Sequence, residues 1–196
     1  MSDSIYKLKK TLVDFVANTK LYPFPGFILF GEASYKVKGP LMRKILNEIQ
    51  PGDILIRMYG HYIGSYFIPG YWTHAAHYEG PNNVIHMLGE GIVEEDILTF
   101  LRCDDVALLR SKKGTESVQA AIKEARFLLD KSNNDPNYKI RYDYDFKSGN
   151  TNFYCTEFVA HIHKLNYPKD KMIMPDKFPK DPDLEIIIPG RREGSI

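Results

Sequence analysis

Hydrophobic residues near the N-terminus recur with helical spacing. Ile5, Leu8, Leu12, Phe15 and Val16 follow one another at intervals that predict an amphipathic helix in the first twenty residues. The run PLMRKILNEIQ predicts a second, short helix over residues 40–50. Between them, residues 21–39 are rich in proline, glycine and aromatic side chains, which favours an irregular covering segment. We therefore expect residues 1–50 to form a helical and aromatic extension ahead of the main domain.

Short apolar runs separated by turn residues predict the strands of that domain. Pro51-Gly52-Asp53 is typical of a turn, and the following run DILIRMY begins a strand. Further strands are predicted over residues 73–79, 83–88 and 105–111, with a helical turn over 94–102. Residues 60–72 carry several glycines, prolines and aromatics, so we expect a loop that lines or covers a site.

Two longer helices are predicted in the second half of the chain. Residues 115–133 place Val118, Ile122, Ala125 and Leu129 on one face, with Thr115 as the expected N-cap. A loop rich in tyrosine and aspartate then leads to the run FYCTEFVAHIHKL, which predicts the second helix. Helices that flank several short strands in this order indicate an α+β domain with a small antiparallel sheet.

Composition limits the classes of partner. The chain has 26 basic and 25 acidic side chains and a net charge of +1, so no overall field attracts nucleic acid or an anionic membrane. Its apolar runs, such as FILF, are far below the roughly 18 residues of a membrane span, and we see no signal peptide. We expect a soluble, cytoplasmic protein that neither binds nucleic acid nor inserts stably into a membrane. The oligomeric state stays unknown.

Histidines in the predicted strands are the first candidates for chemistry. Side chains alternate along a strand, so His74 and Tyr78 share one face while His77 points to the other. The short connection EGPN makes residues 73–79 and 83–88 an antiparallel hairpin. His74 and His86 can then lie side by side on one face, where one imidazole could orient the other.

Cys155 is the candidate nucleophile. It follows the polar run SGNTN and stands in the first turn of the second helix, where free backbone N–H groups and the helix dipole favour an anion. A helix N-terminus and a neighbouring histidine can lower a thiol pKa from about 8.5 by several units. The only other cysteine, Cys103, has no such surroundings, and we expect it to be structural. Two cysteines do not indicate a disulfide framework.

Other roles for these side chains stay open. His74, His77, His86 and Cys155 are all zinc-ligand types, although His77 would need a bulge to join the others. Glu90, four residues after His86, could replace it as the residue that orients the base. Our expectation is a site without metal or cofactor.

Five segments together resemble a known family. PGDILIR, FIPGYWTHAAHYEG, VIHMLGEGI, YDYDF and YCTEFV, spread over about residues 50–188, resemble the YiiX-like and LRAT-like branch of the NlpC superfamily of circularly permuted papain-like cysteine enzymes. The resemblance implies a permuted papain-like (NlpC-type) fold for residues 51–196. It also implies Cys155 as nucleophile, His74 as base and His86 as the third catalytic residue. Many YiiX-like members carry Glu at that third position, whereas two histidines with eleven residues between them match the LRAT-like spacing.

The resemblance implies a cysteine hydrolase that cleaves an amide or peptide bond through an acyl-enzyme. Its substrate would be a small peptide, amide or acyl-containing molecule. The backbone N–H of Cys155 is the natural oxyanion donor, and the expected substrate pocket includes Tyr71, Trp72, Tyr78 and Tyr154. Two alternatives remain: a thiol acyltransferase or lipase that acts on lipid acyl groups, and an inactive module that keeps the pocket for ligand binding.

Overall fold

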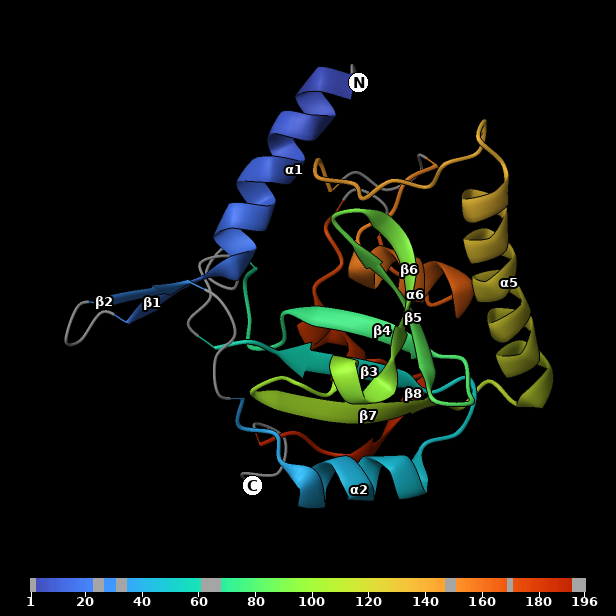
Figure 1. The fold of residues 1–196 in the computed structure, drawn as a ribbon. Helices are drawn as coiled ribbons and strands as arrows, with labels where there is room; N and C mark the ends of the chain where they lie inside the picture. Colours follow the sequence, from blue (N-terminus) through green and yellow to red (C-terminus); the bar gives the residue numbers. More distant parts are fainter. Residues whose placement is uncertain are drawn as a thin grey trace.

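A computed structural model describes residues 3–22, 27–30, 35–60, 68–146, 151–168 and 171–191 of the chain. Six antiparallel strands form the main sheet in the order β6-β5-β4-β3-β7-β8 (Figure 1). They are β3 (Ile54–Met58), β4 (His74–Tyr78), β5 (Asn83–Leu88), β6 (Gly91–Asp96), β7 (Asp105–Ser111) and β8 (Leu184–Ile188). The helices are α1 (Asp3–Asn18), α2 (Gly39–Glu48), α4 (Ile97–Phe100), α5 (Thr115–Asn134) and α6 (Cys155–Ile162), with a 3-10 helix, η1 (Pro175–Lys180). This confirms the α+β class.

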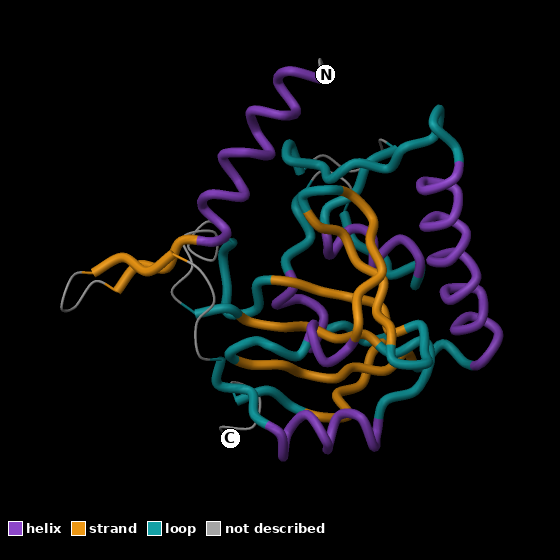
Figure 2. Tube along the Cα trace, in the orientation of Figure 1, coloured by secondary structure: helices purple, strands orange, loops and turns teal. Residues whose placement is uncertain are grey.

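Helices cover both faces of the sheet, so two cores form. The first core includes Ile54 and Ala75 from the strands and Phe158 from α6. The second core lies on the other face and includes Leu55 of β3 and Phe100 of α4. All five residues of β4 are buried because both of its faces are covered. Figure 2 shows the helices on the two sides of the strands.

The N-terminal segments differ in how they join this body. Ile45 of α2 is fully buried in the second core, and the Val37 N–H donates to the Cys103 carbonyl at 3.0 Å. The predicted helix near the N-terminus is present as α1, but its side chains Leu8 and Leu12 are 72% and 63% exposed. The apolar face of α1, which the amphipathic pattern predicts to be buried, therefore faces solvent along part of its length.

Several elements differ from the sequence-based expectation. Within the segment expected to be irregular, β1 (Thr19–Tyr22) and β2 (Phe27–Phe30) pair as a hairpin. The strand β6 was not predicted, and the helical turn expected from residue 94 begins only at Ile97, with Asp96 as its N-cap. As an edge strand, β6 carries three acidic residues and so lacks the apolar pattern of a covered strand. Helix α5 is capped by Gly114 instead of Thr115.

The loop expected at residues 60–72 is described only in part. His61 and the aromatic residues of 62–67 lie outside the described residues. Among the helices that are described, none combines the length and the apolar character needed to cross a bilayer.

Candidate active site

The β4–β5 hairpin brings two imidazoles together. His77 pairs with Ile85 in the hairpin register, which places His74 and His86 diagonally on one face, as strand alternation predicts. His74 Nε2 lies 2.7 Å from His86 Nδ1, and the rings meet nearly edge to face with an interplanar angle of 77°. Both side chains are buried. One ring nitrogen of each histidine is therefore committed to the other.

The surroundings keep both imidazoles neutral. Burial, followed by the Arg57 cation, holds the pKa of His74 and of His86 well below the usual 6.5. Arg57 stands opposite His74 on β3, and its guanidinium lies 4.0 Å from the centre of the Phe100 ring. The same Phe100 ring packs against both histidines. A neutral imidazole keeps a lone pair, so His74 has the protonation state of a base.

Cys155 is the first residue of α6 and lies against the start of β4. Its sulfur accepts hydrogen bonds from the backbone N–H groups of Ala75 and Thr156 and from the Tyr142 hydroxyl. The Ala75 nitrogen belongs to the peptide that joins Ala75 to His74, so the sulfur lies beside the backbone of His74. The cysteine packs with Ala75 in the first core, whereas the His74 ring contacts Phe100 of the second core. Thiol and imidazole thus both adjoin the start of β4, the sulfur at the Ala75 N–H and the His74 ring beside Phe100.

Burial dominates the acidity of this thiol. It raises the pKa of Cys155 above that of a free thiol, although the three hydrogen bonds and Arg57 act in the opposite direction. The expectation that the helix N-terminus would lower this pKa was therefore wrong in direction, since desolvation outweighs the helix end. The resting pair is a neutral thiol and a neutral imidazole.

Tyr142 is a site residue that the sequence analysis did not single out. Its hydroxyl donates to the sulfur of Cys155 and accepts the backbone N–H of the same residue. Burial, followed by the neighbouring Cys155, raises its pKa well above 10.0, so it keeps its proton. The tyrosine-rich run YDYDF was the available signal. The amide expected to bind an oxyanion is thus paired with this hydroxyl in the resting structure.

The aromatic candidates for a substrate pocket have structural contacts. Tyr154 is fully buried, and its hydroxyl accepts the Ile173 N–H at 2.8 Å. Trp72 is 1% exposed within the first core, and its backbone N–H donates to Asp176 at 2.9 Å. The Tyr71 hydroxyl donates to Asp105 at 2.6 Å. Tyr154 and Trp72 therefore hold segments of the fold together, and their contact with a substrate stays a prediction.

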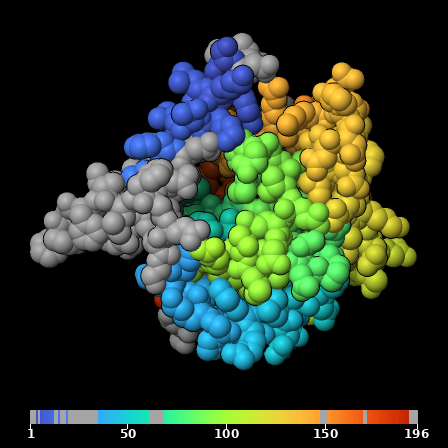
Figure 3. All heavy atoms as spheres, viewed as in Figure 1, coloured from blue at the N-terminus to red at the C-terminus, as the bar shows by residue number. Residues whose placement is uncertain are grey.

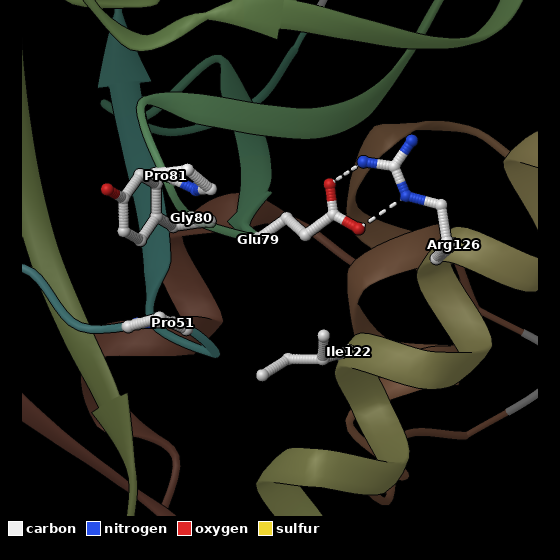
Figure 4. A pocket seen from close by; sticks show the side chains of 7 residues that line it. Pro51, Glu79, Gly80, Pro81, Ile122 and Arg126 are labelled. Atoms are coloured by element: carbon white, nitrogen blue, oxygen red, sulfur yellow. Dashed lines mark hydrogen bonds and ion pairs between the residues drawn. The ribbon is translucent and has the colours of Figure 1, made fainter.

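Tyr78 lies in a separate pocket at the other end of β4. It stands four positions after His74 along the strand, which is about 13 Å at the usual rise. It lines an open pocket of about 620 Å³ beside the Glu79–Arg126 ion pair (Figure 4). The remaining lining residues are Pro51, Gly80, Pro81 and Ile122. Tyr78 thus lies away from His74 along the strand, and its contact with a substrate stays a prediction.

His77 belongs to a different pair, which argues against the zinc alternative. Its Nδ1 lies 3.0 Å from His163 Nε2, on the face away from His74, as strand alternation requires. Across the residues described, no group of three or more His, Cys, Asp or Glu is arranged to hold a metal ion. Glu90, the other suggested partner, lies in the turn between β5 and β6.

Cys103 has the surroundings expected of a structural cysteine. It is fully buried, its sulfur donates to the Asp105 carbonyl at 3.2 Å, and burial raises its pKa to about 12.

The surface is hollowed between α1 and the strands coloured green in Figure 3. Tyr6 links α1 to the turn between β5 and β6, since its hydroxyl donates to the Gly89 carbonyl at 3.0 Å.

One family model matches most of the chain. It is described as the permuted papain-like amidase enzyme, YaeF/YiiX, C92 family, and it matches residues 48–186. This span contains β3 to β7 and α6, with both histidines and the cysteine of the site. No curated protein matches the chain. The resemblance to YiiX-like enzymes is confirmed, whereas the resemblance to LRAT-like enzymes stays a prediction. The chain thus belongs to the permuted papain-like amidase family of YaeF and YiiX.

Proposed function

We propose that the protein is a cysteine hydrolase that cleaves an amide or peptide bond through an acyl-enzyme formed on Cys155. One observation carries the proposal: the Cys155 sulfur accepts the N–H of Ala75, while the neighbouring His74 commits its Nε2 to His86. His74 Nδ1, the ring nitrogen nearer the backbone, is then the atom that exchanges a proton with the thiol. Membership of an amidase family supports the choice of an amide bond.

Both partners are neutral at rest, so proton transfer accompanies attack. The Cys155 thiol gives its proton to His74 as the sulfur bonds to the substrate carbonyl carbon. The imidazolium then donates this proton to the leaving amine, the carbon–nitrogen bond breaks, and a thioester remains. Water, deprotonated by His74, attacks the thioester and releases the carboxylic acid and the free thiol. His86 holds the ring of His74 in one orientation throughout.

Two donors stand ready for the oxyanion of this reaction. In the resting structure the Tyr142 hydroxyl donates to the Cys155 sulfur and accepts the Cys155 backbone N–H, so both donors lie beside the sulfur. A substrate carbonyl that approaches the sulfur would exchange these internal bonds for bonds to its own oxygen. Donors held in place before the reaction stabilise the developing charge most effectively.

Action on lipid acyl groups is a second candidate, and α1 supplies the observation in its favour. Leu8, Leu12 and Phe15 are 72%, 63% and 59% exposed along one helix. An apolar stripe of this kind suits contact with acyl chains. Matched acyl donors that differ only in a peptide amide or a glycerolipid ester distinguish the two candidates, because the one that acylates Cys155 faster is the preferred class.

Alkylation tests whether the thiol is catalytic at all. In a Cys103→Ser background, His74 should assist the reaction of Cys155 with iodoacetamide at pH 7, because it takes the proton of the neutral thiol as the sulfur attacks. The change His74→Ala should therefore slow this alkylation, with His161→Ala as the matched control on an exposed histidine. Intact-mass measurement during turnover of an amide substrate should then detect the thioester. Equal alkylation rates in His74→Ala and His161→Ala, with no thioester during turnover, would favour an inactive ligand-binding module and overturn the proposal.

A further inference from the structure

Behind His86, two buried polar atoms face each other. His86 Nε2 lies 3.6 Å from Glu95 Oε2. Within the part of the chain that the structure describes, neither atom has a hydrogen-bond partner. One is a ring nitrogen that can carry a proton, and the other is a carboxylate oxygen that can only accept one. Buried polar atoms are rarely left unpaired, so the two atoms have complementary needs.

We infer that Glu95 is a positioning residue that acts through His86 on His74. This inference rests on the proposed function of the same site. A carboxylate forces the proton of His86 onto Nε2, so His86 Nδ1 must accept. His74 then carries its own proton on Nε2, the nitrogen bonded to His86, and keeps its lone pair on Nδ1. Each tautomer follows from the one before, and the last is the form that a base for Cys155 needs.

The sheet places the carboxylate for this role. Val84 pairs with Glu95 and His86 with Val93, so Glu95 and His86 share a face of neighbouring strands. Arg57 lies against the same carboxylate oxygen, with its Nη1 3.5 Å from Oε2. The same Nη1 donates to the Phe100 carbonyl at 2.9 Å, which fixes the guanidinium. The carboxylate thus lies between a fixed cation and the second imidazole.

The charge of Glu95 would act when the reaction makes His74 positive. A neutral His86 orients its neighbour and supplies no negative charge, whereas a carboxylate beyond it stabilises the imidazolium. The groups that face Glu95 are Arg57 on β3, His86 on β5, and Asp96 and Glu90 on or beside β6. Arg57 opposes the effects of burial and of the two acidic neighbours, which together raise the pKa of Glu95.

A purely structural role is the rival explanation, since edge strands often carry charged residues against aggregation. The substitution Glu95→Gln separates the two because it keeps the shape and removes the charge. Its amide N–H₂ can also donate, which would push the proton of His86 to Nδ1. The matched control is Glu94→Gln, which changes the neighbouring residue on the opposite face, where Glu94 binds Arg126 at 2.8 Å.

Two measurements test the inference. Nitrogen NMR of the labelled histidines should find both His74 and His86 protonated on Nε2 in the wild type and the His86 proton moved in Glu95→Gln. Alkylation of Cys155 should slow on the order of tenfold to a hundredfold in Glu95→Gln, a part of what general-base catalysis contributes, with a changed pH profile. Glu95→Asp should recover part of the rate, and Glu94→Gln should match the wild type.

The outcomes separate this inference from the proposed function. A wild-type His86 protonated on Nδ1, or a Glu95→Gln variant that alkylates like Glu94→Gln, would overturn the role of Glu95. A wild-type chain that forms no thioester with an amide substrate would overturn the proposed function, while the NMR result would still report the tautomers. If Glu95→Gln does not fold, the wild-type tautomers and the Glu95→Asp rate decide alone.

Discussion

The hydroxyl group of Tyr142 donates a hydrogen bond to the sulfur of Cys155 and accepts one from the amide of the same residue. Removal of the hydroxyl in Tyr142→Phe should therefore slow acylation by about a hundredfold, the usual cost of one oxyanion donor. The measurement is the single-turnover rate of thioester formation with an amide substrate. Tyr144→Phe is the control, because that hydroxyl donates to the Gly89 carbonyl at 3.1 Å. Equal rates in the two variants would remove Tyr142 from the chemistry.

The buried pair His77–His163 should make the fold sensitive to acid. Burial lowers the pKa of His163 to about 3 and that of His77 well below 6.5. Above pH 6.5 neither folded nor unfolded chains bind these protons. Below it only the unfolded chain does, so stability falls by about 1.4 kcal/mol per pH unit for each histidine, down to the folded pKa.

Urea unfolding between pH 7 and 4 measures this slope. His163→Gln should reduce the slope of stability against pH by the contribution of one histidine, about 1.4 kcal/mol per pH unit. This holds even if the substitution also changes the stability at pH 7. His161→Gln is the control, since His161 is exposed on the same helix. An unchanged slope in His163→Gln would show that the His77–His163 pair does not control the loss of stability in acid.

Asp53 and Arg110 form the ion pair on which the start of β3 depends. Asp53 is 2% exposed, accepts Arg110 Nε and Nη2 at 2.8 Å each, and also accepts the Gln50 N–H. Asp53→Ala should lower the free energy of unfolding by about 2–4 kcal/mol, because it leaves a partly buried cation and a backbone donor unpaired. Asp183→Ala, which breaks a more exposed pair with Lys113, should cost less than about 1 kcal/mol. Equal losses in urea unfolding would contradict this.

Gly91 connects the sheet with the segment that carries Tyr142. Its φ is +116°, and an added Cβ would lie 2.5 Å from the Ile140 carbonyl oxygen. Gly91→Ala should therefore cost about 1–3 kcal/mol of stability and slow the alkylation of Cys155, since the Ile140 segment must move. Gly114→Ala is the control: its φ is +83°, but nothing lies within 4 Å of an added Cβ. Normal alkylation in Gly91→Ala would show that Tyr142 is positioned independently.

Local patterns predicted the elements whose partners are close in sequence. Strand alternation and a four-residue connection were enough to place His74 and His86 on one face. The same patterns failed at β6, because an edge strand is exposed on one side and Glu94, Glu95 and Asp96 carry no apolar period. Hairpin geometry is local, whereas the need for an additional strand arises from the assembled sheet.

Long-range contacts account for what the sequence could not provide at the site. The contact of Tyr142 with Cys155 depends on the path of a loop, and Asp176 reaches the Trp72 amide from 104 positions away. The direction of the Cys155 pKa depends on how deeply α6 is buried, which a helix boundary alone does not fix. The helix end was placed correctly, and its electrostatic effect was overridden by the surrounding core.

The odd spacing between His74 and His77 lets one strand serve two buried histidine pairs. Because three residues separate them, one ring turns toward Phe100 and the other toward α6. A single residue inserted between them would turn both rings to the same side and leave one pair unable to form. Length changes inside β4 should therefore be far more damaging to this molecule than side-chain changes at the same positions, and relatives that keep both pairs should keep this interval.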